Sequence, residues 1–117
     1  MGPFYGSWGT ETTVHAFVGS DSAPVLSIDT TNNFLFCFWG GSPTANHVYY
    51  KKRKAGTWDT NPIDWIDEST DGLGSSYRFT SFYKDYGGHV GLVYMTKTTS
   101  NYKVRFAERS GTTVRLK

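Results

Sequence analysis

One pattern occurs twice in this chain and constrains its fold more than any other feature. Residues 25–39 read as a short strand, a polar turn rich in Asp and Asn, and a strand that is apolar on both faces. Residues 81–94 repeat that order with an Asp and two Gly in the turn. Asn, Asp and Gly favour such turns because they tolerate left-handed backbone. Two hairpins of this kind predict antiparallel sheets built from a repeated unit.

Further residues recur at a nearly constant spacing. The matching pairs lie 54 to 56 positions apart: Ser27 and Ser81, Gly56 and Gly111, Val48 and Val104, Tyr50 and Phe106, and Arg53 and Arg109. Small insertions in loops explain the drift in spacing, because loops tolerate length changes better than strands do. The alternative is a chance alignment of scattered aromatic residues.

The composition agrees with a β fold. The chain has 117 residues, of which 38% are hydrophobic, 17% aromatic and only 19% charged. Thr, Tyr, Phe, Val and Gly dominate, whereas the strong helix formers Ala, Leu, Glu and Gln are sparse, and this bias is typical of strands and turns. We therefore expect residues 1–117 to form a single all-β domain.

Each repeat has the size of one blade of a β-propeller, in which four-stranded antiparallel sheets surround a central axis. We expect the first repeat at about residues 24–72 and the second at about residues 77–117. Residues 12–18 form a further strand in the position of a blade's outermost strand. The second repeat is expected to lack a fourth strand of its own.

Two blades cannot close a ring, and each would leave an apolar face and a strand edge without a neighbour. A cyclic homo-oligomer removes both problems if residues 12–18 of one subunit supply the outer strand of the next subunit's last blade. The alternatives are a single β-sandwich or small barrel, and a piece of a longer propeller.

The repeat resembles the blades of the sialidase-like propellers with Asp-box turns. Residues 24–39 are similar to the inner hairpin of that family, and residues 48–58 to its third strand and turn. The Asp-box form Ser-x-Asp-x-Gly-x-x-Trp is not kept: residues 52–58 lack the Asp, and residues 111–114 lack the Trp. The resemblance implies a propeller fold more firmly than it implies an activity.

A sialidase-type active site, as the resemblance implies it, needs several arginines, a Tyr–Glu pair and an acid/base Asp. Arg78 precedes an inner strand, and Tyr77 lies beside it. Glycosidase chemistry requires two carboxylic acids on opposite sides of the sugar. The acids at positions 67, 68 and 71 all belong to one polar loop. We therefore do not expect catalysis by a single chain.

Metal and cofactor chemistry has no sequence signature here. The three histidines, His15, His47 and His89, are far apart, and Cys37 is the one cysteine, most simply a small core residue. No glycine-rich phosphate loop precedes a helix. We expect no cofactor and no metal.

The net charge of +2 is small, and residues 51–54 are the one dense basic cluster, so nucleic-acid binding is not expected. No apolar run is long enough to span a membrane, and the first residues lack the features of a signal peptide. These observations assign no cellular location.

The aromatic residues carry the functional expectation, because sugars bind against flat aromatic faces with a few polar groups that fix their orientation. Aromatic packing between blades is the structural alternative. The candidate ligand-binding residues are Trp39, Tyr94, Trp58, Trp65, Arg78, Asn46, Asn101, Arg105 and Glu108. We expect a non-enzymatic, lectin-like propeller that binds glycans at repeated sites. The alternatives are a sialidase-like hydrolase subunit or fragment, and a structural module without a small ligand.

Overall fold

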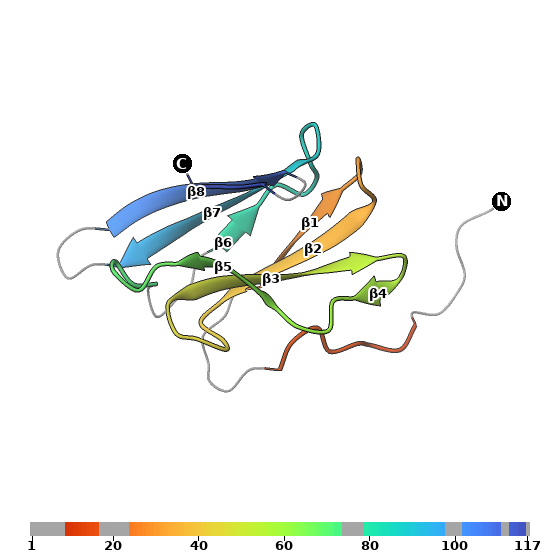
Figure 1. Ribbon diagram of the computed structural model, residues 1–117, viewed down its shortest axis with the longest axis horizontal. Coiled ribbons are helices and arrows are strands. Elements are labelled where there is room, and N and C mark those ends of the chain that lie inside the picture. Colours follow the sequence, from red (N-terminus) through yellow and green to blue (C-terminus); the bar gives the residue numbers. More distant parts are fainter. Residues whose placement is uncertain (1–8, 17–23, 74–78, 98–101, 111–112, 117) are drawn as a thin grey trace.

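The computed structural model describes residues 9–16, 24–73, 79–97, 102–110 and 113–116, and it confirms the all-β prediction. The described elements form two sheets without a helix (Figure 1). The first sheet contains β1 (Val25–Asp29), β2 (Phe34–Gly40), β3 (His47–Lys54), β4 (Thr57–Trp58) and β5 (Ile63–Asp67). The second contains β6 (Phe79–Ser81), β7 (His89–Lys97), β8 (Tyr102–Ser110) and β9 (Thr113–Leu116).

Both sheets are antiparallel meanders. The first has the order β1-β2-β3-β4, with β5 pairing β3 beyond β4, and the second has the order β6-β7-β8-β9. The predicted turn chemistry explains the hairpins: Asn33 before β2 has a φ of 59°, and Gly87 and Gly88 before β7 have φ values of 63° and 83°. These left-handed positions are the ones that Asn and Gly occupy at little cost.

The strand register aligns the residues of the first repeat with those of the second. The hairpin of β3 and β4 closes with the pair Lys54 and Thr57, and that of β8 and β9 closes with Ser110 and Thr113, each 56 positions later. With this alignment every residue pair of β2 and β3 has a counterpart in β7 and β8; Phe38 opposite Tyr50, for example, becomes Val93 opposite Phe106. Val48, Tyr50 and Arg53 therefore match Val104, Phe106 and Arg109.

One of the expected matches is wrong by one residue. Ser27 pairs with Phe36, whereas Ser81 pairs with Leu92, the counterpart of Cys37. Ser81 therefore corresponds to Leu26, which is the partner of Cys37. Gly111 lies outside the described residues. The two serines were matched because they are the same residue type, although the strand register places them at different positions of the repeat.

The faces through which the two sheets pack are not equivalent in the repeat alignment. The shared core consists of Phe36, Phe38, Val48, Tyr50, Ile66 and Leu73 from the first repeat and Val90, Leu92, Tyr94 and Ala107 from the second. The counterparts of Phe36 and Phe38 are Gly91 and Val93, and these lie on the face of the second sheet that points away from the core, which we call its outer face. The repeats are thus joined head to tail. A face-to-face pair related by twofold symmetry would bury matching residues instead.

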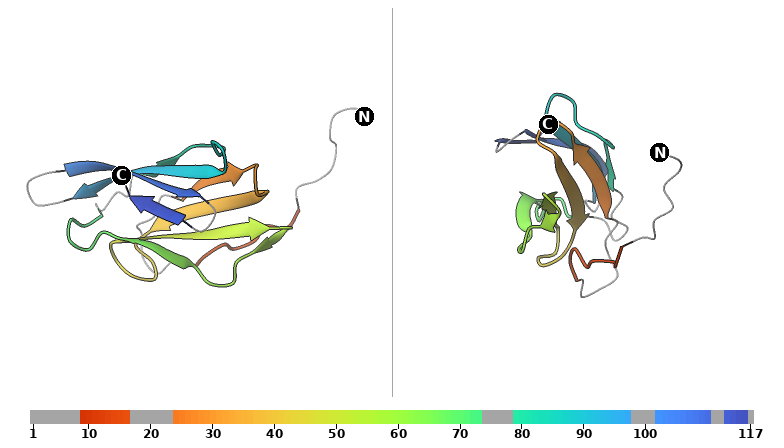
Figure 2. Two further views of the ribbon diagram at one scale, coloured as in Figure 1. Left: turned by 45° about the horizontal axis from the view of Figure 1, so that its top comes forward. Right: turned by 90° about the vertical axis from the view of Figure 1, so that its right-hand side faces the viewer.

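β1 and β6 hold the two sheets together side by side, as Figure 2 shows. Ile28 and Lys84 form an isolated parallel bridge, in which the Ile28 amide donates to the Tyr83 carbonyl at 3.0 Å. The Asp85 carboxylate accepts hydrogen bonds from the Thr30 amide and hydroxyl and from the Thr31 hydroxyl. It also accepts one from the Gly88 amide in its own turn. Asp85 therefore ties the first hairpin to the second.

One expectation about the outer strands is corrected. Residues 12–16 form no strand, and residues 17–18 lie outside the described part of the chain. The described segment instead lies across the outer face of the first sheet, where the Val14 carbonyl accepts a hydrogen bond from Lys51 Nζ and the His15 ring stacks on Trp39 at 4.7 Å. These side-chain contacts replace the ladder of backbone bonds that a strand would need.

The second sheet has a short strand that the sequence analysis did not expect. β9 pairs with the last four residues of β8, from Ala107 to Ser110, and corresponds to β4. Among the described residues, nothing in the second sheet corresponds to β5, which covers β3 from His47 to Tyr50.

We predict that Asp85→Asn lowers the melting temperature at neutral pH, whereas Glu11→Gln, at an exposed position, leaves it unchanged. Hydrogen bonds from Thr30, Thr31 and Gly88 hold the pKa of Asp85 well below its ordinary value of 3.8. The stabilisation is therefore complete above that value and is lost as the pH falls through the lower, folded-state pKa. Thermal unfolding at several pH values between about 7 and 2 checks this. Equal melting temperatures of variant and wild type at neutral pH would contradict it.

Candidate functional site

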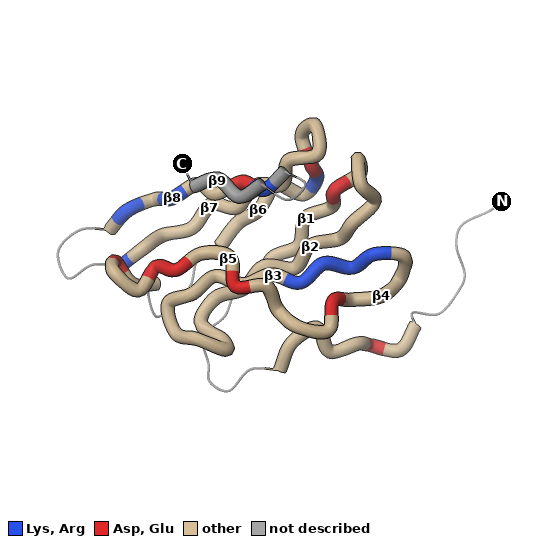
Figure 3. The backbone as a smooth tube through the Cα atoms, in the orientation of Figure 1, with Lys and Arg blue, Asp and Glu red and all other residues tan. Residues whose placement is uncertain are grey.

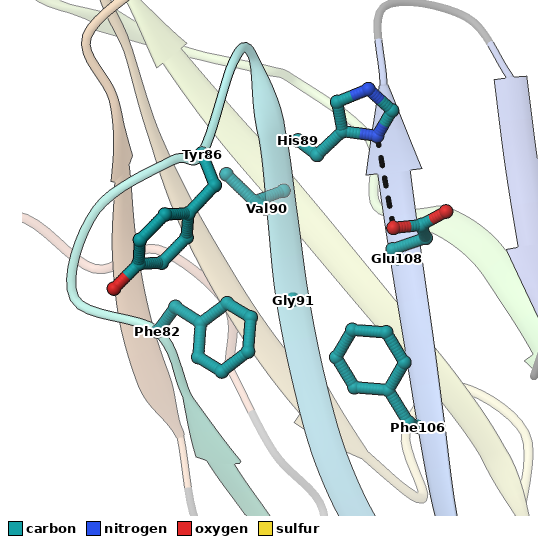
Figure 4. A pocket seen from close by; sticks show the side chains of 7 residues that line it. All are labelled: Phe82, Tyr86, His89, Val90, Gly91, Phe106 and Glu108. Atoms are coloured by element: carbon teal, nitrogen blue, oxygen red, sulfur yellow. Dashed lines mark ion pairs between the residues drawn. The ribbon is translucent and has the colours of Figure 1, made fainter.

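An aromatic pocket opens on the outer face of the second sheet (Figure 4). Its volume is about 330 Å³, its floor is Gly91, and the rings of Phe82 and Phe106 lie on either side of that glycine, with a centroid distance of 5.8 Å and planes tilted by 41°. The pocket depends on the glycine. A Cβ at position 91 would lie 2.7 Å from the Phe82 ring and 3.0 Å from that of Phe106.

A histidine, a glutamate and a tyrosine form the rim of this pocket. Nδ1 of His89 lies 3.7 Å from a carboxylate oxygen of Glu108, and the two side chains come from the neighbouring strands β7 and β8. The Tyr86 ring stands edge-on to Phe82 and is largely exposed. Aromatic walls beside a carboxylate can bind a cation that carries apolar surface, or the apolar face and hydroxyls of a sugar.

The outer face stays apolar beyond the pocket. Met95 and Val104 are opposite one another on β7 and β8, and their exposed fractions are 40% and 71%. Tyr102 is exposed at 66% and Phe82 at 38%. Apolar residues grouped on one sheet face in this way mark an interaction surface more often than an ordinary solvated one.

A second cluster of charged side chains lies where the loop after β5 meets β8. Arg105 donates to Glu68 at 2.8 Å and to Asp71 at 2.7 Å, and Lys103 donates to Asp71 at 3.0 Å. The bond to Glu68 raises the pKa of Arg105, and the bond from Lys103 lowers the pKa of Asp71. Burial, with Glu68 close by, raises the pKa of the Tyr94 hydroxyl. The cluster fastens the loop to the sheet.

The predicted aromatic residues are not gathered into one site. Trp39 and Tyr94 are almost completely buried, at 1% and 0% exposure. Trp39 lies on the outer face of the first sheet with Tyr49, and its indole donates to the Ser42 carbonyl at 2.7 Å. Tyr94 lies in the core between the sheets. Neither ring presents an open face in the single chain.

The other predicted residues are also dispersed. Trp58 packs against the Trp39 cluster, and Trp65 packs against Phe38 in the core. The Asn46 side chain accepts a hydrogen bond from the Leu73 amide. Arg105 belongs to the ion-pair cluster, Glu108 is in the aromatic pocket, and Arg78 and Asn101 lie outside the described residues.

Sequence reasoning missed Phe82, Phe106 and Gly91 as a group. One signal was available: a glycine in the middle of an apolar strand indicates that another group approaches the backbone closely. The approaching group, Phe82, could not be identified, because it comes from an irregular turn after β6 that brings its ring over β7.

Comparison with models of known families, with curated proteins and with solved structures gave no match. Within the described residues, no group of three or more His, Cys, Asp or Glu side chains is arranged to hold a metal ion. The described part of the chain also contains no helix that is long and apolar enough to cross a membrane.

We predict that Glu68→Gln destabilises the protein by about 1–3 kcal/mol, because it removes the more buried of the two carboxylates that bind the Arg105 guanidinium. Urea unfolding checks this, with Glu11→Gln as a control that removes an exposed carboxylate. An unchanged unfolding midpoint for Glu68→Gln would contradict a structural role for the ion pair.

Proposed function

We propose that the chain is the subunit of a small homo-oligomeric β-propeller, assembled head to tail. The observation that supports this most directly is that the two sheets of one chain pack through faces that are not equivalent in the two repeats. The inner face of the first sheet, with Phe36 and Phe38, binds the inner face of the second, with Leu92 and Tyr94. Because the repeats match, the outer face of the second sheet is the equivalent of the inner face of the first, and the outer face of the first sheet is the equivalent of the inner face of the second.

The two remaining faces are complementary by this correspondence. Val93, Val104 and Phe106 on the outer face of the second sheet correspond to Phe38, Val48 and Tyr50, which are buried between the sheets. The outer face of the first sheet corresponds in turn to the inner face of the second. The outer face of the second sheet in one copy therefore fits the outer face of the first sheet in another. Contacts of this head-to-tail type close into rings when the rotation between copies permits.

The segment of residues 9–16 has an alternative binding position in such a ring. In the single chain it covers part of the outer face of the first sheet, around Trp39. No described strand pairs with Lys103–Phe106 on the side away from β7, although β5 covers the corresponding edge of β3. In the assembly, this segment leaves the face and pairs with that edge of a neighbouring copy, as a strand added to an open sheet.

Light scattering coupled to size exclusion tests the assembly. We expect a mass of two or more times the 13.1 kDa of a single chain, in whole multiples. Val104→Glu, which puts a charge on the exposed apolar face, should shift the mass towards one chain, while Thr70→Glu, in an exposed loop, should not. A wild-type mass of one chain at high concentration would refute the proposal.

Lectin-like glycan binding is a second candidate function, and the aromatic pocket favours it. Phe82 and Phe106 offer ring faces, and Glu108 offers a hydrogen-bond acceptor for sugar hydroxyls. Single-site affinity would be weak, and repeated sites in a ring would raise it by avidity.

A glycan array tests this candidate, and we expect binding that Phe106→Ala abolishes and that Tyr83→Ala, at an exposed ring outside the pocket, retains. An assay with a fluorogenic sialoside accompanies the array. Turnover of that sialoside would contradict the non-enzymatic reading, and absence of binding would leave assembly as the function.

A further inference from the structure

The contact between the two sheets includes a cation held over aromatic rings. The guanidinium of Arg109, on the inner face of the second sheet, lies 4.5 Å from the centre of the Tyr50 ring and 5.7 Å from that of Phe36. A guanidinium at this distance is attracted by the ring faces, more strongly when water is excluded. Arg109 is thus part of what joins the first sheet to the second.

The residues of this contact have counterparts on the two outer faces. Arg53 corresponds to Arg109 and lies on the outer face of the first sheet, in the basic run at the end of β3 (Figure 3). Tyr50 corresponds to Phe106, and Phe36 corresponds to Gly91. The rings that receive Arg109 are therefore replaced, on the outer face of the second sheet, by the aromatic pocket.

We propose that this pocket receives the Arg53 side chain of a second copy of the chain. The inference rests on the proposed assembly and specifies its contact. The guanidinium lies against Phe106 as that of Arg109 lies against Tyr50, and Phe82 supplies the second ring that Phe36 supplies within the chain. Because Gly91 has no side chain, the Phe82 ring can lie over it beside Phe106, and the pocket that these rings line has a volume of about 330 Å³.

The charges around the pocket favour this occupant. Lys52 is the residue on the inner face of the first sheet that corresponds to Glu108, so a cation within the chain is replaced by an acid in the pocket. Glu108 already lies beside His89, at 3.7 Å. A carboxylate next to two aromatic rings matches the planar guanidinium of arginine in both charge and shape. The pocket therefore offers an arginine a carboxylate at the position where the first sheet has Lys52.

The surroundings of Arg53 are open to such a contact. Arg53 is exposed, and it borders an open hollow of about 640 Å³ that also involves Leu26, Leu35 and Trp58. Leu26 and Ile28 on the same face are exposed at 55% and 48%. Thr12 and Val14 also line this hollow, and because their segment leaves the face in the proposed assembly, apolar surface for a partner is freed beside the arginine.

Reversal of charge tests the contact. We expect Arg53→Glu to weaken self-association by about tenfold or more, since it places two carboxylates together. Lys54→Glu makes the same change in charge at the next position, but its side chain lies on the opposite side of β3, so the association should stay close to wild type. The double variant with Arg53→Glu and Glu108→Arg should recover most of the lost affinity, because the pair is rebuilt with reversed charges.

Sedimentation equilibrium gives the association constants, and circular dichroism shows whether each variant folds. A monomeric wild type would refute the assembly itself. An oligomeric wild type with equal affinities for Arg53→Glu and Lys54→Glu would refute the arginine contact and leave the assembly standing. Binding of a glycan in the pocket of the intact oligomer would also overturn the inference, because the pocket cannot hold a sugar and Arg53 together.

Discussion

The core between the two sheets is the constraint on which the rest of the structure depends. Phe36 and Phe38 meet Leu92 and Tyr94 there, and all four are buried. Full burial of such side chains contributes roughly 1.5–3 kcal/mol each. Neither meander can fold alone with one apolar face in water, since a sheet of this size needs a second layer to cover it. The contact between repeats is therefore also what stabilises each repeat.

Polar groups fix the relative position that this apolar contact leaves free. Apolar packing is not directional, so sliding of one sheet over the other would cost little without them. Asp85 binds the turn between β1 and β2, and Arg105, on the inner face of the second sheet, binds Glu68 in the loop after β5. Each links parts of the chain that are far apart in sequence. The register seen in the core follows from these two anchors.

The sequence was sufficient to predict the all-β class, both hairpins and the alignment of Tyr50 with Phe106. It was sufficient because turn residues and strand patterns are local signals that need no knowledge of the packing. The irregular course of residues 12–16 was not predictable, because it depends on the Lys51 side chain and the Trp39 ring, contacts between distant residues. The candidate site failed for a similar reason. Trp39 and Tyr94 are both buried, one on the outer face of the first sheet and one in the core between the sheets, whereas Phe82 was not considered and Phe106 was considered only as the match of Tyr50.

The differences between the repeats are more informative about function than their likeness. If the outer face of the second sheet had only to be soluble, polar residues would replace Val93 and Val104, as on most open sheet faces. The face instead keeps apolar residues there and changes in character at other positions. Gly91 stands where the first repeat has Phe36, which lets the Phe82 ring lie over the strand, and Glu108 stands where it has Lys52, which brings a carboxylate to the pocket. In the proposed assembly, these differences suit the outer face of the second sheet to a basic group from another copy. Arg53, the counterpart of Arg109, is the group proposed for that contact.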